Sequence, residues 1–203
     1  MSKATIWNYL KTHTELSDEA IAGIMGNMEA ESNCESCRVQ GDFTADRRTS
    51  KAYAQAVNSG AKSIDAASQD KLGFGLCQWT FPQRKKNCFN ACRSYGVGIE
   101  NESAQLAFML AEMQMEFTNM WNRLLITHDI TEAARLVCQE YERPAVLNIT
   151  ARSKAGQAIY NEFHGKDVTP EPDPEPSPSP VPSDDRTDKI IALLEQIIKL
   201  LKE

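Results

Sequence analysis

SDEAIAGIMGNMEAES, residues 17–32, has the pattern of an amphipathic helix on which the rest of the chain is expected to pack. Ser17 is a natural N-cap, because its hydroxyl can accept a hydrogen bond from an otherwise unpaired backbone N–H. Acidic residues follow it and suit the positive end of a helix dipole. Four large apolar residues recur at helical spacing and form one face: Ile21, Ile24, Met25 and Met28.

Two glycines, Gly23 and Gly26, lie inside this predicted helix. Each costs about 1 kcal/mol of helix stability relative to alanine, so an interior pair needs a structural reason. Close packing by a neighbouring backbone is a common one. We therefore expect another segment to lie tightly against this helix.

The predicted helix ends with two carboxylates, Glu29 and Glu31, which fall on opposite edges of its apolar face. A carboxyl group at the edge of a buried face is partly desolvated, which raises its pKa and suits a general acid. Many glutamates near a helix end are simply solvated, and helix geometry does not distinguish these two. On the residues alone, either glutamate is a candidate proton donor.

The 203-residue chain has a net charge of −6 that is unevenly distributed. Residues 1–166 contain 18 basic and 19 acidic side chains, whereas residues 167–203 contain 4 and 9. The first region is nearly neutral and gives no sign of nucleic-acid binding. No apolar run reaches the roughly 18 residues of a membrane span, and MSKATIWNYL at the start lacks the apolar core of a secretory signal peptide.

Six cysteines include two closely spaced pairs, Cys34–Cys37 and Cys88–Cys92, each of which resembles half of a zinc site. A second Cys-x-x-Cys is missing, and the chain has only three histidines. Without a secretory signal, reduced thiols are favoured over disulfides. We predict free cysteines, no metal site and no cofactor.

Apolar periodicity predicts six or seven helices and little strand, which gives a compact, mainly α fold with a small loop or hairpin region. Besides 17–32, the predicted helices cover residues 3–12, 51–58, 84–95, 103–124, 131–141 and 151–163. Residues 33–72 are polar and poor in large apolar groups, which is typical of segments that build or cover a site.

GFGLCQWTFPQRK, residues 73–85, combines two glycines with aromatic and amide side chains, as where backbone approaches a ligand. Gln78 and Trp79 form a pair that is common in carbohydrate sites, where a flat ring meets a sugar face and an amide meets its hydroxyl groups. Phe74 belongs to the same candidate surface. The alternative is a turn whose tryptophan fills the core, and the residues alone leave both open.

Several motifs, in order, resemble the phage tail-type lysozyme family, which is found in endolysins and tail-tip lysins. AGIMGNMEAES at 22–32 resembles its catalytic-helix motif, and GFGLCQWT at 73–80 is similar to its Gly-Tyr-Gly-Leu-x-Gln-Trp-Thr motif. YERPA at 141–145 is similar to its late Tyr-Glu-Arg-Pro segment, and YAQAVNSG at 53–60 resembles such domains from phages of clostridia-like hosts. The resemblance covers about residues 4–164. Cys77 and the Cys34/Cys37 segment depart from the family pattern.

The resemblance implies a lysozyme-like, α+β but mainly α fold and an endolysin that cleaves the β-1,4 glycan strand of bacterial peptidoglycan. In the family motif the Glu of Ala-Glu-Ser is the general acid, so the resemblance favours Glu31 over Glu29. It also places Gln78 and Trp79 in the sugar-binding cleft. Tyr141 and Glu142 would then support the floor of that cleft.

Glycoside hydrolysis commonly uses a second carboxylate, and Asp70 is our candidate for it, because the family often has an Asp before the Gly-Phe-Gly-Leu segment. The less favoured alternatives are Asp65, Asp42 and Glu35. Many members of the superfamily use the single Glu, so Asp70 is a hypothesis that structure and mutation can test.

Residues 167–186, DVTPEPDPEPSPSPVPSDDR, predict an extended linker that could separate two modules by roughly 60 Å. Residues 187–203 predict an amphipathic coiled-coil helix with a wide apolar stripe that cannot be stable alone. We expect it to form a homo-oligomer, a trimer or tetramer. The alternatives are docking onto the domain of residues 1–166 and, less favoured, association with a membrane surface.

The sequence is compatible with three functions. The main one is a muramidase-type hydrolase made in the host cytoplasm and acting on the cell wall after release. A lytic transglycosylase is the alternative within enzymes. A non-catalytic phage structural or wall-binding protein is the alternative outside them, although such a protein would not need Glu31, Gln78 and Trp79 together.

Overall fold

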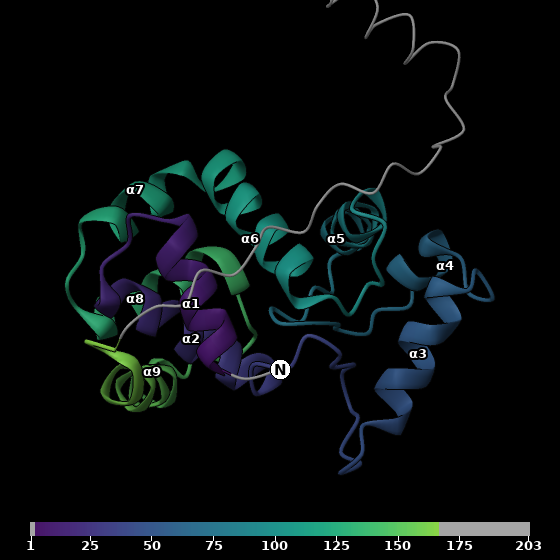
Figure 1. Ribbon diagram of the computed structural model, residues 1–203, viewed down its shortest axis with the longest axis horizontal. Coiled ribbons are helices and arrows are strands. Elements are labelled where there is room, and N and C mark those ends of the chain that lie inside the picture. Colours follow the sequence, from purple (N-terminus) through teal and green to yellow (C-terminus); the bar gives the residue numbers. More distant parts are fainter. Residues whose placement is uncertain (1–2, 167–203) are drawn as a thin grey trace, which may run out of the picture.

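The computed structural model describes residues 3–166, which contain nine α-helices and one π-helical turn (Figure 1). The helices in chain order are α1 (Lys3–His13), α2 (Asp18–Ser32), α3 (Arg48–Asn58), α4 (Ile64–Ser68), α5 (Pro82–Ser94), α6 (Glu102–Glu116), α7 (Thr118–Ile126), α8 (Ile130–Leu136) and α9 (Ile149–Phe163), with the π-helix η1 (Val137–Glu142) between the last two. The mainly α fold that the sequence predicts is confirmed. In place of a hairpin, the loop region has two isolated antiparallel bridges, Val39–Phe74 and Phe74–Trp79.

The predicted linker at 167–186 and the predicted helix at 187–203 lie outside the described residues. Among residues 3–166, no helix combines the length and the apolar character needed to cross a lipid bilayer.

Helix α2 is the central helix of the fold, and α1, α8 and α9 pack around it. It begins as expected, because the Ser17 hydroxyl accepts a hydrogen bond from the backbone N–H of Ala20 at 3.0 Å. Its apolar face is fully buried, with Ile21 and Met25 completely inaccessible to solvent. Asn33 ends the helix in a left-handed conformation, and its N–H bonds to the carbonyls of the last turn.

The two interior glycines of α2 let neighbouring helices approach closely. A methyl group on Gly23 would collide with Ala133 of α8 and lie 2.7 Å from the backbone nitrogen of Ala134. A methyl group on Gly26 would collide with the carbonyl of Arg152 in α9 and lie 2.8 Å from the nitrogen of Gly156. The close packing predicted from these glycines is therefore confirmed.

The hydrophobic side chains form two cores that lie side by side. The larger one surrounds α2 and takes in α1 and α6 to α9, whereas the smaller one joins α3, α4 and part of α5. Helix α5 contributes to both, because Cys88 faces the larger core and Phe89 the smaller one. The segment before it does the same through Leu76 and Phe74. Figure 1 shows α3 and α4 set apart from the helices around α2.

Two predicted helices differ from the structure, and one helix of the structure was not predicted. The helix expected at 103–124 begins earlier, after the N-cap Asn101, and is broken at Phe117, where the backbone leaves helical geometry between α6 and α7. The helix expected at 131–141 is capped by Asp129 and changes at Val137 from an α-helix to a π-helix. The short helix α4 has too few residues for a periodic signal and was not predicted.

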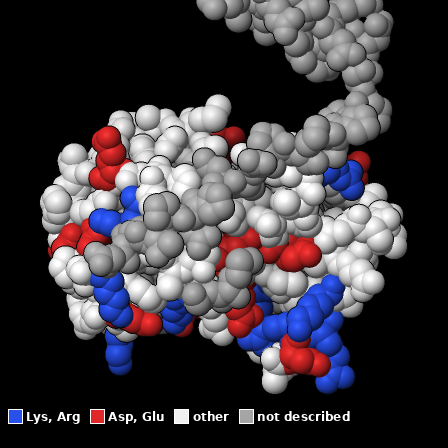
Figure 2. Space-filling model, in the orientation of Figure 1, with Lys and Arg blue, Asp and Glu red and all other residues white. Residues whose placement is uncertain are grey.

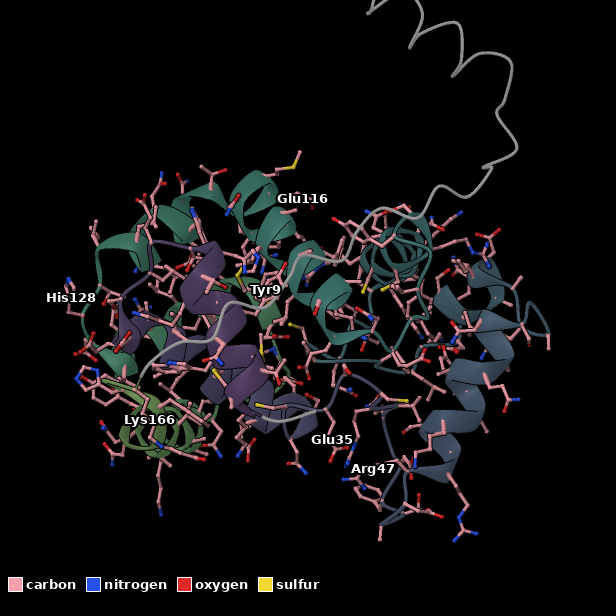
Figure 3. All side chains as sticks on the ribbon, viewed as in Figure 1. Tyr9, Glu35, Arg47, Glu116, His128 and Lys166 are labelled. Carbon is pink, nitrogen blue, oxygen red and sulfur yellow. The ribbon has the colours of Figure 1, made fainter. Side chains whose placement is uncertain are left out.

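The loop from α2 to α3 is held by polar contacts as well as by Cys34 and Val39, which lie in the larger and the smaller core. Arg47 donates from Nε to Glu35 Oε2 at 2.6 Å, and Figure 3 shows the two labelled side chains near each other at the lower edge of the view. The Asp42 carboxylate accepts hydrogen bonds from Thr44 and Ser50. On the face shown in Figure 2, acidic and basic side chains are interspersed and separated by uncharged surface, in keeping with the nearly neutral charge of this region.

Candidate active site

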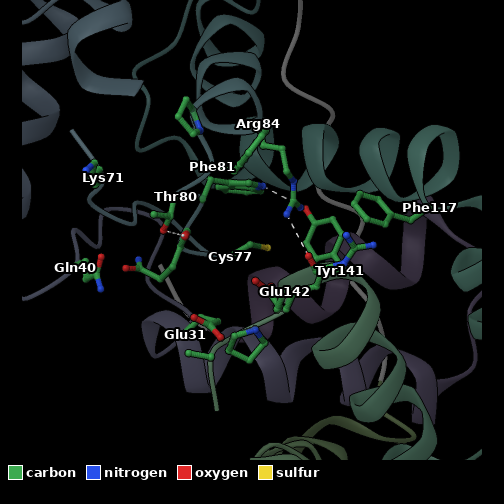
Figure 4. A pocket seen from close by; sticks show the side chains of 16 residues that line it. Glu31, Gln40, Lys71, Cys77, Thr80, Phe81, Arg84, Phe117, Tyr141 and Glu142 are labelled. Atoms are coloured by element: carbon green, nitrogen blue, oxygen red, sulfur yellow. Dashed lines mark hydrogen bonds between the residues drawn. The ribbon is translucent and has the colours of Figure 1, made fainter. Parts of the chain in front are cut away.

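A pocket of about 1070 Å³ opens where segments from several parts of the chain meet (Figure 4). Its lining includes Glu31 at the end of α2, the segment Cys77–Pro82, Phe117 between α6 and α7, and Tyr141–Ala145. The strongest sequence motifs therefore meet at one cavity, although they are far apart in the chain.

The structure separates the two glutamates that helix geometry left equivalent. Glu31 lines the pocket and keeps 19 % of its side chain exposed. Glu29 does not line it and forms an ion pair with Lys3 of α1 at 2.9 Å. Of the two, only Glu31 can meet a molecule bound in this pocket.

Glu31 is held by an arginine from the last helix. Arg152 Nη2 lies 2.6 Å from Glu31 Oε1, and its Nη1 donates to Asn27 Oδ1 at 3.0 Å. Asn27 is fully buried and donates to the carbonyls of Gly23 and Ala134. The Glu31 carboxylate is thus fixed by a chain of contacts that joins α2, α8 and α9.

Glu142 is a second carboxyl group in the same pocket, presented by the π-helix η1. Its Oε1 atom is enclosed and has no hydrogen-bond partner among residues 3–166. Burial raises the pKa of Glu142 well above its usual range, and the negative charge of Glu31 raises it further. In Figure 4 its carboxyl group is turned toward Glu31.

A network of buried polar groups supports one wall of the pocket. The Glu112 carboxylate accepts two hydrogen bonds from Arg84, at 2.7 and 2.8 Å, and one from the Tyr141 hydroxyl at 2.6 Å. Trp79 Nε1 donates to Tyr141 and, at 3.4 Å, to Glu112. The Arg84 guanidinium also lies 4.3 Å from the centre of the Tyr141 ring. Bidentate pairing of this kind fixes orientation as well as charge.

The glycine-rich segment at 73–79 is attached to α2, α6 and the loop between α2 and α3 by side-chain hydrogen bonds. Ser32, at the end of α2, donates to the carbonyl of Leu76 at 2.9 Å. Gln105 of α6 accepts from the backbone N–H of Leu76 and lies so close to Gly75 that any side chain there would collide with it. Gln78 lines the pocket, but its amide nitrogen donates to the carbonyls of Arg38 and Gly75.

Three non-glycine residues in the pocket lining have left-handed backbone conformations: Lys71 (φ 63°), Gln78 (φ 44°) and Arg143 (φ 50°). Such conformations cost free energy and persist where the surrounding structure enforces them, often at functional sites. Their concentration here supports the choice of this pocket as the candidate active site.

Two predicted site residues lie away from the pocket lining. Asp70 accepts hydrogen bonds from the ammonium groups of Lys62 and Lys85, both at 2.6 Å, and from the Tyr53 hydroxyl at 2.8 Å. Burial alone would raise the pKa of Asp70, but these donors bring it down to about 2. Phe74 is fully buried in the smaller core.

The structure also shows pocket residues that the sequence did not single out. Phe81 lines the pocket with 66 % of its surface exposed, whereas the predicted stacking residue, Trp79, is only 2 % exposed. Arg84 of α5 holds Glu112, and Arg152 of α9, which lies behind the lining, holds Glu31. The sequence TFPQRK contained a signal for Phe81 and Arg84, since it follows the Gln-Trp pair directly, but nothing in it marks Arg152.

All six cysteines are free thiols in the structure, and all but Cys37 are buried. Cys34 donates a weak hydrogen bond to the carbonyl of Met25, and burial raises the pKa of Cys37 to about 11. Within the described part of the chain, no three His, Cys, Asp or Glu side chains are grouped so that they could hold a metal ion.

The sequence model of the family described as phage tail lysozyme matches residues 2–163. The matched region includes every residue that lines the pocket.

Proposed function

The chain belongs to the phage tail lysozyme family, and we propose that its pocket hydrolyses the β-1,4 glycan strand of peptidoglycan as a muramidase with Glu31 as general acid. Membership of the family carries the general assignment, a lysozyme-like peptidoglycan hydrolase. The proposed bond and the proposed proton donor rest on the pocket.

The observation that carries the proposal is the position of Glu31. It is the α2 carboxylate that opens into a cavity large enough for sugar rings, whereas Glu29 is paired with Lys3 elsewhere. Protonation of the glycosidic oxygen by a carboxylic acid is what glycoside hydrolysis requires, and it leaves positive charge on the sugar ring. A carboxylate in the same pocket then stabilises that charge or activates water.

The rest of the pocket suits a carbohydrate ligand. The exposed ring of Phe81 offers a flat apolar face at its edge, and polar side chains of Gln40, Gln78 and Thr80 lie in the same lining. Trp79 and Tyr141, bound to Glu112, form the wall behind them. This combination of an apolar surface with a few oriented polar groups is typical of small-ligand sites.

Asp70 remains a candidate second carboxylate, but its two lysine partners and its position outside the pocket lining favour a structural role. Glu142 lies in the pocket lining itself and is therefore the better placed candidate for a second carboxylate.

Lysis of purified Gram-positive cell walls by wild type, Glu31→Gln and Glu29→Gln tests the proposal. Removing a general acid costs about 10²–10⁴-fold in rate, so Glu31→Gln should be almost inactive while circular dichroism shows a folded protein. Glu29→Gln is the matched control, since the half-buried ion pair with Lys3 that it loses lies outside the pocket lining, and it should remain active. Full activity of Glu31→Gln, or no release of reducing ends by wild type from any wall tested, would contradict the proposal.

Product masses then distinguish hydrolysis from transglycosylation. A hydrolase adds one water molecule at each cleavage, whereas a lytic transglycosylase leaves an anhydro sugar that is lighter by one water. We expect the hydrated product. The anhydro product would keep the peptidoglycan substrate and Glu31 but replace the muramidase assignment.

A further inference from the structure

The resting pocket poses a problem for a general acid at Glu31. Arg152 forms an ion pair with Glu31 at 2.6 Å, and both side chains are largely buried. An ion pair requires a carboxylate, whereas a general acid must carry a proton. A proton therefore has to reach Glu31 before it can act, and the pocket should contain a source for it.

Glu142 has the environment of a carboxyl group that carries a proton. Its enclosed Oε1 atom has no hydrogen-bond partner in the described part of the chain. A hydrogen bond with Cys77 and the charges of Arg84 and Arg152 favour the carboxylate. Burial and the charge of Glu31 outweigh them and raise the pKa of Glu142 well above its usual range, so the carboxyl group takes up a proton. The pocket therefore contains one carboxyl group paired with a cation and one that burial keeps neutral.

The surroundings of Glu142 couple it to Glu31. The charged and titratable groups that act on it come from α2, the glycine-rich segment, α5, α9 and η1 itself: Glu31, Cys77, Arg84, Arg152, Cys138 and Tyr141. After burial, the largest effect is the negative charge of Glu31, which raises the pKa of Glu142, while both arginines lower it. Loss of the charge on either carboxyl group would therefore change the protonation of the other.

We propose that Glu142 holds the proton of the resting pocket and passes it to Glu31 when substrate binds. This inference rests on the proposed role of Glu31. The Glu142 O–H bond breaks and an O–H bond forms on Glu31, which leaves Glu142 as a carboxylate. Glu31 then protonates the leaving glycosidic oxygen, water supplies a hydroxyl group to the sugar carbon, and the remaining proton of that water returns to the carboxyl pair. Glu142 is thus a positioning residue that acts through Glu31.

The π-helix η1 accounts for the position of Glu142 in the pocket lining. Its wider turn shifts the side chains that follow Leu136 relative to an α-helix, and such turns are frequent at functional sites. Tyr141, which begins the YERP motif, bonds to Glu112, and Glu142 beside it lines the pocket.

The first test measures protonation without activity. In protein labelled with ¹³C-glutamate, the side-chain carbon of Glu142, assigned by its loss in Glu142→Gln, should titrate at least one pH unit above the ordinary midpoint of about 4.3. In Glu31→Gln, the midpoint of Glu142 should fall, because the negative charge beside it is gone. A midpoint at or below the ordinary value in wild type overturns the proposal, and so does a midpoint that is the same in Glu31→Gln.

The second test measures wall cleavage as a function of pH. Glu142→Gln should lose about 10²–10⁴-fold in kcat and lose the high-pH limb of the wild-type profile, with less effect on KM. Glu142→Asp keeps a titratable group and should recover part of the loss. Glu140→Gln is the matched control on η1, because its partner is Arg123 on the surface, and it should behave as wild type. An unchanged rate and pH profile in Glu142→Gln overturns the proposal.

The two tests separate this inference from the proposed function. If wild type cleaves no wall, the proposed function fails, and the titration of Glu142 in wild type and in Glu31→Gln still decides whether the two carboxyl groups are coupled. If Glu31→Gln is inactive but Glu142→Gln is fully active, the proposed function stands and the proton transfer is refuted.

Discussion

Two aromatic side chains of the pocket, Trp79 and Phe81, have different roles: one supports the pocket wall and the other is exposed to a ligand. Trp79 was the expected sugar platform, but its ring is almost fully buried and its N–H is used by Tyr141 and Glu112. Phe81, two residues later, keeps most of its ring exposed at the pocket. The Gln-Trp motif thus shapes the wall, and the next aromatic residue offers the surface that a sugar can touch.

This division predicts that Phe81→Ala weakens substrate binding without weakening the fold. An exposed aromatic contact is worth about 0.5–1.5 kcal/mol, so KM for soluble glycan fragments should rise up to about tenfold while kcat changes little. Phe43→Ala removes an exposed ring outside the pocket lining, at 87 % exposure against 66 % for Phe81, and serves as the control. An unchanged KM in Phe81→Ala, or an equal rise in Phe43→Ala, would contradict the prediction.

Asp70 gives a second prediction at the residue scale, in which stability depends on pH. The folded-state pKa of Asp70 is about 2, whereas an unfolded aspartate has a pKa of about 3.9. The carboxylate therefore contributes stability that is complete above about pH 4 and is lost as the pH falls from about 4 to about 2. Asp70→Asn should remove this pH dependence in urea unfolding curves.

The same substitution leaves Lys85, whose side chain is fully buried, without its anionic partner. Breaking a buried pair in this way costs about 3–5 kcal/mol. Asp65→Asn is the control, because its ion pair with Lys86 lies mostly in solvent. If Asp70→Asn unfolds like wild type but fails to cleave walls, the structural role is refuted and Asp70 is the second catalytic carboxylate that the sequence suggested.

At the scale of helices, the sequence predicts those elements that periodic apolar residues and N-caps mark locally. It does not predict which elements contact each other in the folded chain. Helix α2 was predicted because Ser17 and four apolar residues mark it within a single stretch. The break at Phe117 was hidden, because the apolar stripe continues across it and its cause is tertiary: the Phe117 ring packs on Tyr141 and Arg84.

The candidate site, like the helices, could be predicted only where the sequence carries a local motif. The residues that lie within motifs, Glu31, Gln78, Tyr141 and Glu142, come together at the pocket. Arg152 lies 121 positions from Glu31 and carries no local signal, so only the folded chain shows the pair. Its place is fixed by the contact of α9 with α2, which Gly26 makes possible.

That contact leads to a prediction at the element scale. Gly26→Ala places a methyl group against the backbone of α9 at Arg152 and Gly156, where flexible side chains cannot give way. Overpacking of this kind costs about 1–3 kcal/mol, despite the higher helix propensity of alanine. Thermal unfolding should show a lowered Tm for Gly26→Ala.

The same prediction extends to activity, because a displaced α9 moves Arg152 relative to Glu31. Wall cleavage by folded Gly26→Ala should therefore fall as well. Ala30→Ser, on the exposed face of the same helix, should stay within about 0.5 kcal/mol of wild type. A Tm for Gly26→Ala at or above that of wild type would show that α9 does not press on α2 at this position.

At the scale of the whole molecule, the pocket depends on both cores being held together. Helix α5 and the segment before it contribute side chains to each, and the lining is drawn from the parts around α2 and from the glycine-rich segment. The residues that follow the domain, 167–203, carry a different pattern, with a proline-rich stretch and then an apolar repeat. We propose that this repeat joins copies of the domain.

The oligomer proposal predicts that the full chain sediments as a trimer or tetramer, whereas a chain ending at residue 166 sediments as a monomer. An apolar stripe of about 16 residues is not stable as an isolated helix, and its width favours three or four copies over two. Because linked sites on one polymer reinforce each other, the truncated chain should bind walls at least about tenfold more weakly at low concentration, with an unchanged rate on soluble fragments.

Full-length chain with Leu194→Lys and Ile198→Lys is the control that keeps the length but removes the stripe, and it should behave like the truncated chain. A monomeric full-length chain would refute self-association, and an oligomer that survives both substitutions would place the interface on the domain instead.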